Sequence, residues 1–127
     1  MPKEQHSPKC NNTAIALRQK LMEAGKIVIL ITTGSEEEAH RIADQLLNQR
    51  KAACVNIVPR VDSLFWWQGK LDSAQESLLV IKTKTSKLKE ITELVKKVHS
   101  YEVPEVIALP IVGGNEDYLK WLDTTLE

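Results

Sequence analysis

Two long apolar segments separated by a two-residue turn constrain the fold of this chain more than any other feature. The turn is Gln68-Gly69, and the run Phe65-Trp66-Trp67 before it holds half of the chain's Phe, Trp and Tyr residues. This pattern predicts a β-hairpin. Successive strand residues point to opposite faces of a sheet, so Trp66 and Trp67 cannot both fill the core of one subunit. We therefore expect an oligomer or a ligand pocket at the hairpin tip; the alternative is a half-buried aromatic pair closing an ordinary hairpin.

Length, charge and cysteine usage narrow the class of protein. With 127 residues the chain is long enough for one domain, and its formal net charge is zero, with acids and bases mixed. This balance argues against a nucleic-acid-binding stripe or a polybasic membrane anchor, and no apolar run approaches the roughly 20 residues that span a bilayer. The first residues lack the apolar segment of a secretion signal, and Cys10 and Cys54 do not form a disulfide framework. We expect a reduced, cytoplasmic protein.

Residues 1–26 are expected to be an N-terminal appendage to a domain that covers residues 27–127. The first dozen residues are polar and include two prolines, which is typical of disorder. Asn12 or Thr13 can cap a short helix that Gly25 ends. The apolar residues on one face of this helix are Ala14, Leu17, Leu21 and Ala24. That face can dock on the domain or on a neighbouring chain.

The first half of the domain has the pattern of strand, helix and strand. Residues 27–31 form a β-branched run without polar alternation, which is typical of a central strand buried on both faces. Ser35-Glu36-Glu37-Glu38 is a capping box, with Ser35 as the N-cap, and starts an amphipathic helix that ends near Arg50. The next strand begins at Ala52, and Pro59 within it predicts an edge position, a bulge or a bend.

The second half has the pattern of strand, helix, strand and helix. The return arm of the hairpin leads to a helix that Thr85 or Ser86 caps and that Val103-Pro104 breaks. A last strand covers residues 106–112, and Asn115 caps a C-terminal helix. The order of the elements predicts an α+β fold of the ferredoxin-like, or split βαβ, type with the helices on one face of the sheet.

The predicted hairpin is too long for that sheet. Its arms, about residues 53–67 and 70–84, would each reach roughly 45 Å, whereas a helix of some 15 residues covers only about 22 Å. Half of the hairpin therefore protrudes and exposes backbone edges that can pair with another chain. Phe65, Trp66 and Trp67 are the candidate residues of an oligomer interface, for which closed rotational symmetry is the usual solution.

Five motifs, in order and at matching spacing over about residues 27–127, resemble the CutA family of divalent-cation tolerance proteins. They are Ala52-Ala53-Cys54-Val55-Asn56-Ile57, Phe65-Trp66-Trp67-Gln68-Gly69-Lys70, Ile81-Lys82-Thr83, His99-Ser100-Tyr101-Glu102-Val103-Pro104-Glu105 and Asn115-Glu116-Asp117-Tyr118-Leu119-Lys120-Trp121-Leu122. The resemblance implies a ferredoxin-like fold that assembles as a homotrimer similar to PII-type signalling proteins. Gln68 departs from the family pattern, in which an acid is common, and Ser100 stands where a proline commonly follows the histidine.

His99 is the best candidate for a metal ligand. A transition-metal site needs imidazole, thiolate or carboxylate groups that converge at about 2 Å. The three histidines, His6, His40 and His99, are scattered along the chain, and no Cys-x-x-Cys pair exists. Glu102 and Glu105 are close to His99 in sequence and can supply oxygen ligands to copper or another divalent cation, across a subunit boundary if needed. The alternative is that His99 ends a helix because an imidazolium suits the helix dipole.

A second group of residues predicts a ligand cleft. Trp67, Lys70, Lys82 and Tyr101, with Glu105 beside them, are expected near one another at subunit boundaries, from strand geometry and from the family resemblance. Two lysines, a phenol and an indole around one cleft can hold a small anion or a planar ligand. The alternative is ordinary packing at the interface.

The residue pattern points away from catalysis. The sequence shows no Ser-His-Asp or Cys-His arrangement and no glycine-rich phosphate loop, so we expect no enzyme. Aliphatic central strands and a balanced charge argue against an RNA-recognition domain. The favoured function is a non-catalytic trimer that binds divalent metal, copper in particular, and contributes to metal tolerance. The alternative is a PII-like signalling or sensor scaffold that binds a small metabolite or a partner protein in clefts between subunits.

Overall fold

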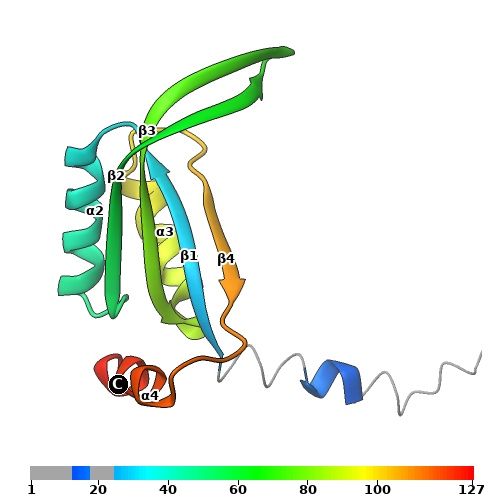
Figure 1. The fold of residues 1–127 in the computed structure, drawn as a ribbon, viewed down its shortest axis with the longest axis vertical. Coiled ribbons are helices and arrows are strands. Elements are labelled where there is room, and N and C mark those ends of the chain that lie inside the picture. The colour runs from blue at the N-terminus through cyan, green and yellow to red at the C-terminus, as the bar shows by residue number, and fades with distance from the viewer. Residues whose placement is uncertain (1–12, 18–24) are drawn as a thin grey trace, which may run out of the picture.

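The computed structural model describes residues 13–17 and 25–127 (Figure 1). Residues 13–17 form a short helix with exposed side chains, and Lys26, expected to end the N-terminal appendage, is instead the first residue of β1; residues 1–12 and 18–24 of the expected appendage lie outside the described residues. The elements of the domain are β1 (Lys26–Thr33), α2 (Glu36–Asn48), β2 (Cys54–Trp67), β3 (Lys70–Lys84), the 3₁₀ turn η2 (Thr85–Lys87), α3 (Leu88–Val98), β4 (Val106–Pro110) and α4 (Glu116–Thr125). None of the helices in these two described ranges is long and apolar enough to cross a membrane.

The strands form one sheet in the order β2-β3-β1-β4, in which every neighbouring pair is antiparallel. Helices α2 and α3 cover one face of this sheet, and α4 lies at the end where β1 begins (Figure 1). A salt bridge of 3.0 Å between Lys26 Nζ and Asp123 Oδ2 joins α4 to β1, and Leu122 of α4 is fully buried. The predicted α+β, ferredoxin-like fold is confirmed.

The core lies between the sheet and the two helices. Burial alternates along β1, where Ile27, Ile29 and Ile31 are buried against α2 and α3 while the residues between them are only partly covered. The prediction that this strand is buried on both faces is therefore wrong for the chain by itself. A continuous apolar run indicates two apolar environments, but the helices of one chain supply only one.

The sheet face opposite α2 and α3 is mainly apolar and only partly covered. Residues directly opposite one another in the strand pairs share a face, which places Leu30 beside both Val80 and Ile107. Ile107 and Leu109 are each 51% exposed. We call this surface the open face; it consists of Val28, Leu30, Val58, Leu78, Val80, Ile107 and Leu109.

The long hairpin protrudes from the body, as predicted (Figure 1). β3 pairs with β1 only from Ser77 to Lys84, whereas its pairing with β2 continues to Lys70 at the tip. We call residues 61–76 the overhang. Near its base the register of β2 and β3 shifts between Val58 and Val61, which confirms the irregularity predicted at Pro59.

The tip of the hairpin has the expected turn. Gln68 (φ 51°) and Gly69 (φ 78°) both have left-handed backbone, as a type I′ turn requires. Trp66 and Trp67 are 71% and 60% exposed, so neither indole lies in the core of the chain. The two indoles at the tip therefore remain available to a second surface.

Three element boundaries differ from the prediction. No side chain caps the start of α3, which follows η2 instead of a cap at Thr85 or Ser86. α3 ends at Val98, well before Pro104, because tertiary contacts hold His99 in an extended conformation. β4 ends at Pro110 instead of residue 112, since the backbone bond from Ile111 N to Lys26 O already reaches the first residue of β1.

Candidate functional site

A buried polar cluster lies where β1 passes into α2. Ser35 caps α2 as predicted, accepting a 3.1 Å hydrogen bond from Glu38 N. The Glu38 side chain is itself buried, with 4% of its surface exposed. Its carboxylate accepts hydrogen bonds from Gly34 N (3.2 Å), Ser100 N (2.7 Å) and Ser100 Oγ (3.0 Å). Glu38 thus joins the start of α2 to the segment that follows α3.

The environment of Glu38 favours its ionised form. Burial raises the pKa of the carboxyl, but hydrogen bonds from Ser100 and Gly34 and the nearby His99 outweigh it, so the pKa is below its usual value. Because each donor points at an acceptor that carries charge, these bonds belong to the strong, charge-assisted class. The Glu38 carboxylate is therefore a stable anion in the interior.

His99 contacts the backbone through both ring nitrogens. Nε2 lies 2.8 Å from the carbonyl oxygen of Thr32, so Nε2 carries the hydrogen, and Nδ1 accepts a 2.9 Å hydrogen bond from Tyr101 N. Nδ1 also lies 3.7 Å from Oε2 of Glu38, and the imidazole is fully buried. In this arrangement the ring fixes the segment after α3 to the end of β1, and its nitrogens are occupied.

Tyr101 extends the cluster to the hairpin. Its hydroxyl donates a 2.8 Å hydrogen bond to Glu76 Oε2, and its ring packs on His99 with centroids 4.7 Å apart. Burial, followed by the bond to Glu76, raises the pKa of Tyr101 to about 12. A Cβ at position 34 would lie 3.4 Å from the Tyr101 hydroxyl, in ordinary van der Waals contact with it.

The predicted metal ligands lie close together in the sequence, but the structure does not bring them around a common point. His99 is buried, whereas Glu102 and Glu105 are exposed. In the part of the chain that the structure describes, no three His, Cys, Asp or Glu side chains lie close enough to hold a metal ion. The donor set of one chain therefore does not fit a metal site by itself. Of the other histidines, His40 is exposed on α2, and His6 lies outside the described residues.

The four residues of the predicted ligand cleft do not meet within one chain. Trp67 and Lys70 line a shallow pocket of about 340 Å³ at the hairpin tip, together with Gln68, Leu71 and Asp72. Lys82 is twelve residues further along β3, roughly 40 Å away along an extended strand. Its ammonium lies 3.9 Å from Cys54 Sγ, and Tyr101 is bound to Glu76.

Sequence reasoning missed the roles of Glu38 and Glu76 in the buried cluster. One signal was present for Glu38: it lies four residues before Ile42, on the stripe of α2 that faces the core. A charged residue on that stripe indicates a partner inside the protein. No local pattern identifies Glu76, because its partner Tyr101 is distant in sequence and reaches it only in the folded chain.

Comparison with known proteins identifies one family. The family model described as "CutA1 divalent ion tolerance protein" matches residues 27–125. The rice protein "Protein CutA 1, chloroplastic" is 51% identical over 96 residues, which cover 76% of this chain and 54% of that protein. The Arabidopsis protein "Protein CutA, chloroplastic" is 42% identical over 116 residues, which cover 91% of this chain and 64% of that protein. The chain thus spans about half to two thirds of the length of these plant relatives.

A solved structure of similar fold comes from Archaeoglobus fulgidus. It is described as the periplasmic divalent cation tolerance protein CutA, and it matches with a TM-score of 0.78 and 44% identity over 80% of this chain and 99% of that one. The names of these relatives do not favour the alternative of a metabolite or partner sensor.

The expectation of a cytoplasmic protein is wrong. The two plant relatives are named chloroplastic, and the Archaeoglobus protein is described as periplasmic. The expectation rested on cysteine usage and on the lack of an apolar signal segment. Neither property identifies the cytoplasm, because a protein without disulfides is compatible with several cellular compartments.

Proposed function

Since the chain belongs to the CutA1 divalent ion tolerance family, we propose that it serves tolerance to divalent cations as a non-catalytic homotrimer. The observation that supports the proposed assembly is the open face. Ile107 and Leu109 are half exposed there, whereas the other face of the sheet packs against the helices. Contiguous apolar surface of this kind marks a protein interface. The second support is the overhang, whose tip exposes Trp66 and Trp67.

The two surfaces favour a ring over a simple pair. The overhang and the open face belong to different parts of the chain, so a contact between the overhang of one copy and the body of the next is heterologous. Heterologous contacts close into rings when the rotation permits, and the family resemblance favours three copies. Phe65, Trp66 and Trp67 are the residues we assign to this contact, with Lys70 beside them.

Assembly also bears on where a cation is held. The described residues of one chain offer no set of three ligands, and we propose that the site draws on more than one chain. Glu102 and Glu105 are exposed and follow the segment that His99 fixes, and we propose that their carboxylates supply oxygen ligands at the boundary between chains. His99 can join them only if Tyr101 N gives up its bond to Nδ1.

Copper is the first cation to test. For a site of nitrogen and oxygen ligands, affinity among divalent first-row metals is highest for Cu²⁺. We further propose that the same boundary brings the tip residues Trp67 and Lys70 of one chain toward Lys82 and Tyr101 of another, around a cleft for a small anion.

The experiment is a copper titration of the full chain, followed by native mass spectrometry. We compare the unchanged protein with the double variant Glu102→Gln, Glu105→Gln and with a control that removes two exposed acids elsewhere, Asp44→Asn with Glu93→Gln. The proposal expects a trimer in all three and a loss of copper uptake only in the first variant. Equal uptake by all three would reject these ligands, and a monomer would reject the assembly.

A further inference from the structure

The overhang receives little support from the sheet of its own chain. β3 pairs with β1 only as far as Ser77, so residues 61–76 form a two-stranded ribbon that bends away from the direction of β1 (Figure 1). Two-stranded ribbons twist more than wider sheets, and an isolated hairpin is only marginally stable in water. Strand pairing alone therefore does not fix where the tip of the overhang points.

The backbone pairing is also interrupted where the overhang joins the body. The register shifts between Val58 and Val61, which leaves Pro59 and Arg60 outside the regular pairing of β2 with β3. Pro59 has no N–H to donate, and its carbonyl oxygen accepts a 2.7 Å hydrogen bond from Ser77 Oγ. An irregularity of this kind bends the strand and interrupts its ladder of hydrogen bonds. The base of the overhang is therefore a point at which the hairpin can change direction.

Tyr101 supports the overhang from outside the hairpin. Of the described residues outside β2 and β3, it is the only one that forms a hydrogen bond or ion pair with the overhang, through the 2.8 Å bond from its hydroxyl to Glu76 Oε2. Glu76 pairs with Val61, directly beyond the shift in register. Because the acceptor is a carboxylate, the bond belongs to the stronger, charge-assisted class. We call this bond the brace; it links the overhang to the segment after α3.

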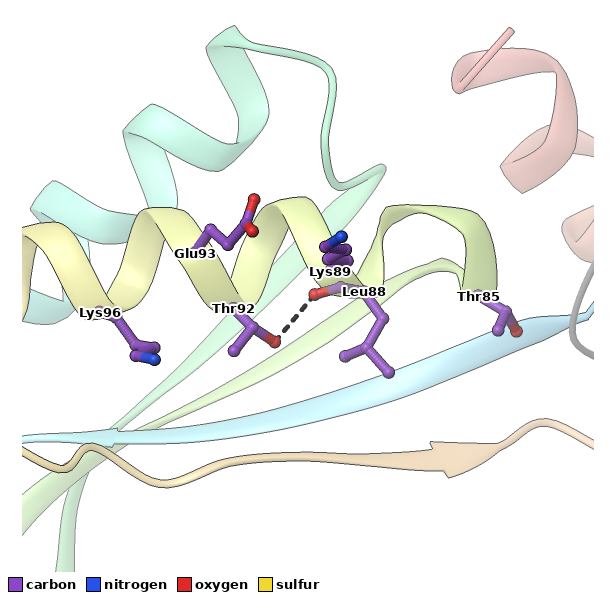
Figure 2. A pocket seen from close by; sticks show the side chains of 6 residues that line it. All are labelled: Thr85, Leu88, Lys89, Thr92, Glu93 and Lys96. Carbon is purple, nitrogen blue, oxygen red and sulfur yellow. Dashed lines mark hydrogen bonds between the residues drawn. The ribbon is translucent and has the colours of Figure 1, made fainter.

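The body of the domain holds Tyr101 in place. Figure 2 shows the groove of about 470 Å³ along α3, in which Leu88 and Thr92 point to the side on which the strands lie. Two further residues of α3 are fully buried in the core, so this helix is packed firmly on the sheet. After α3, the Tyr101 ring packs on His99 with centroids 4.7 Å apart, and His99 contacts the carbonyl of Thr32 at the end of β1. The brace therefore starts from a rigid base.

The length of the overhang makes its direction critical. Between Glu76 and Lys70 it extends about 20 Å at about 3.3 Å per residue. A rotation of about 10° at the base of such an arm moves the tip by roughly 3–4 Å, which is enough to break a hydrogen bond or a close-packed contact. Support at the base therefore decides whether Trp66 and Trp67 reach a fixed position.

Given the proposed homotrimer, on which this inference rests, we propose that Tyr101 is a positioning residue for assembly. Its bond to Glu76 holds the overhang at the angle at which the tip meets the next chain. Because the overhang is held in that direction before two chains meet, association loses less conformational freedom. The residue acts within its own chain, about 20 Å from the tip that makes the contact.

A spin-label distance measurement tests the brace within one chain. In a background with Cys10→Ser and Cys54→Ser, labels are attached at Ser73→Cys in the overhang and at Asp44→Cys on α2, both at exposed positions. Labelled chains are refolded with an excess of unlabelled chains, so that few assemblies contain more than one labelled chain. The distribution of distances between the two labels then reports the direction of the overhang relative to the body.

We expect Tyr101→Phe to shift or broaden this distribution by several ångströms. Thr83→Val is the matched control, because it removes another buried hydrogen bond, the 2.6 Å bond from Thr83 Oγ1 to Lys51 O, at the far end of β3 from the overhang. The control should leave the distribution unchanged. Equal distributions in the unchanged protein and in Tyr101→Phe would overturn the proposal, whether or not the protein is a trimer.

The exchange of chains between trimers tests the consequence for assembly. Isotope-labelled and unlabelled protein are mixed, and native mass spectrometry follows the appearance of mixed trimers. We expect Tyr101→Phe to exchange chains several-fold faster than the unchanged protein, and Thr83→Val to exchange at the unchanged rate. Adding Glu76→Ala to Tyr101→Phe should cause no further acceleration, because both changes remove the same bond.

The outcomes separate this inference from the proposed function. A trimer whose exchange rate Tyr101→Phe does not change, or two changes whose effects add fully, would overturn the positioning role of Tyr101 and leave the homotrimer intact. An unchanged protein that is monomeric would overturn the proposed homotrimer and the positioning role together.

Discussion

The Tyr101 hydroxyl donates a 2.8 Å hydrogen bond to Glu76 Oε2, and this bond ties the segment after α3 to the base of the overhang. Glu76 directly precedes Ser77, the residue at which β3 begins to pair with β1. Tyr101 is in turn linked to His99, whose ring contacts the end of β1. The direction in which the hairpin leaves the body is thus set by side chains of another segment as well as by the strand pairing.

Removing this bond should weaken the protein. For Tyr101→Phe we expect a loss of about 1–3 kcal/mol in the free energy of unfolding, because the Glu76 carboxylate loses a charge-assisted partner. Urea denaturation at one fixed protein concentration measures the loss. Ser73→Ala, on an exposed part of the overhang, is the control and should change little. A Tyr101→Phe variant as stable as that control would show that the bond contributes nothing.

Alkaline pH should destabilise the folded protein through ionisation of Tyr101. The pKa of Tyr101 is raised to about 12 in the folded protein, above its ordinary value of 10.0. A raised pKa means that the neutral phenol contributes stability below pH 10 and that this contribution is lost as the pH rises through about 12. Stability measured against pH should therefore fall less steeply over this window in Tyr101→Phe. If the free energy of unfolding fell equally steeply with pH in both proteins, ionisation of Tyr101 would not be the cause of the loss.

Acidic pH should destabilise the folded protein through protonation of Glu38. Its pKa is lowered on folding from the ordinary value of 4.5, so its contribution is present above that pH and is lost as the pH falls through the folded value. We expect Glu38→Gln to cost about 1–3 kcal/mol at neutral pH, because the bonds from Ser100 and Gly34 lose their charged acceptor. Below pH 4 the difference in the free energy of unfolding between the unchanged protein and Glu38→Gln should become smaller. Glu37→Gln, at an exposed position of the same helix turn, should leave stability unchanged at both pH values.

The hairpin turn depends on left-handed backbone at Gly69. Its φ is 78°, and a Cβ there would meet no atom within 4 Å, so Gly69→Ala changes backbone strain alone. We expect a loss of about 1–2 kcal/mol in the free energy of unfolding. Gly113→Ala is the matched control, since a Cβ at Gly113 also meets open space and its φ is not in the left-handed region. Equal stability of the two variants would contradict a left-handed turn.

The open face should control assembly. Leu109→Lys places a charge on β4 at a residue that is 51% exposed in one chain, so the fold of the chain should survive while association fails, since burying an unpaired ammonium is costly. Val112→Lys, at a residue that is 98% exposed and outside β4, is the control. Light scattering after size-exclusion chromatography measures the mass of each. A Leu109→Lys protein with the mass of the unchanged assembly would place the interface elsewhere.

The sequence predicted those parts of the fold that depend on local patterns. The turn at Gln68-Gly69, the irregularity at Pro59 and the cap at Ser35 all follow from the preferences of residues close in the chain, and the structure has them. The early end of α3 was not predictable in this way. It depends on the contact of His99 with the carbonyl of Thr32, which forms only after β1 and α3 have packed.

The candidate site was harder to predict from the sequence, because its contacts also form only when distant segments have packed together. Nearness in sequence suggested that His99 works with Glu102 and Glu105, yet the carboxylate closest to its ring is Glu38, from a different helix. Lys70 and Lys82 are on one strand, and their separation along β3 prevents a common cleft within one chain. The sequence does not specify how a second chain would bring such residues together.

Native mass spectrometry of the gently purified full chain, before and after one equivalent of Cu²⁺ per chain, tests the proposed assembly and the proposed copper uptake together. We expect the mass of three chains in the absence of metal, because the open face and the overhang are properties of the folded protein. We also expect stepwise copper uptake by that trimer, which Glu102→Gln with Glu105→Gln removes. A monomer that takes up no copper would contradict both the proposed assembly and the proposed role in divalent-cation tolerance.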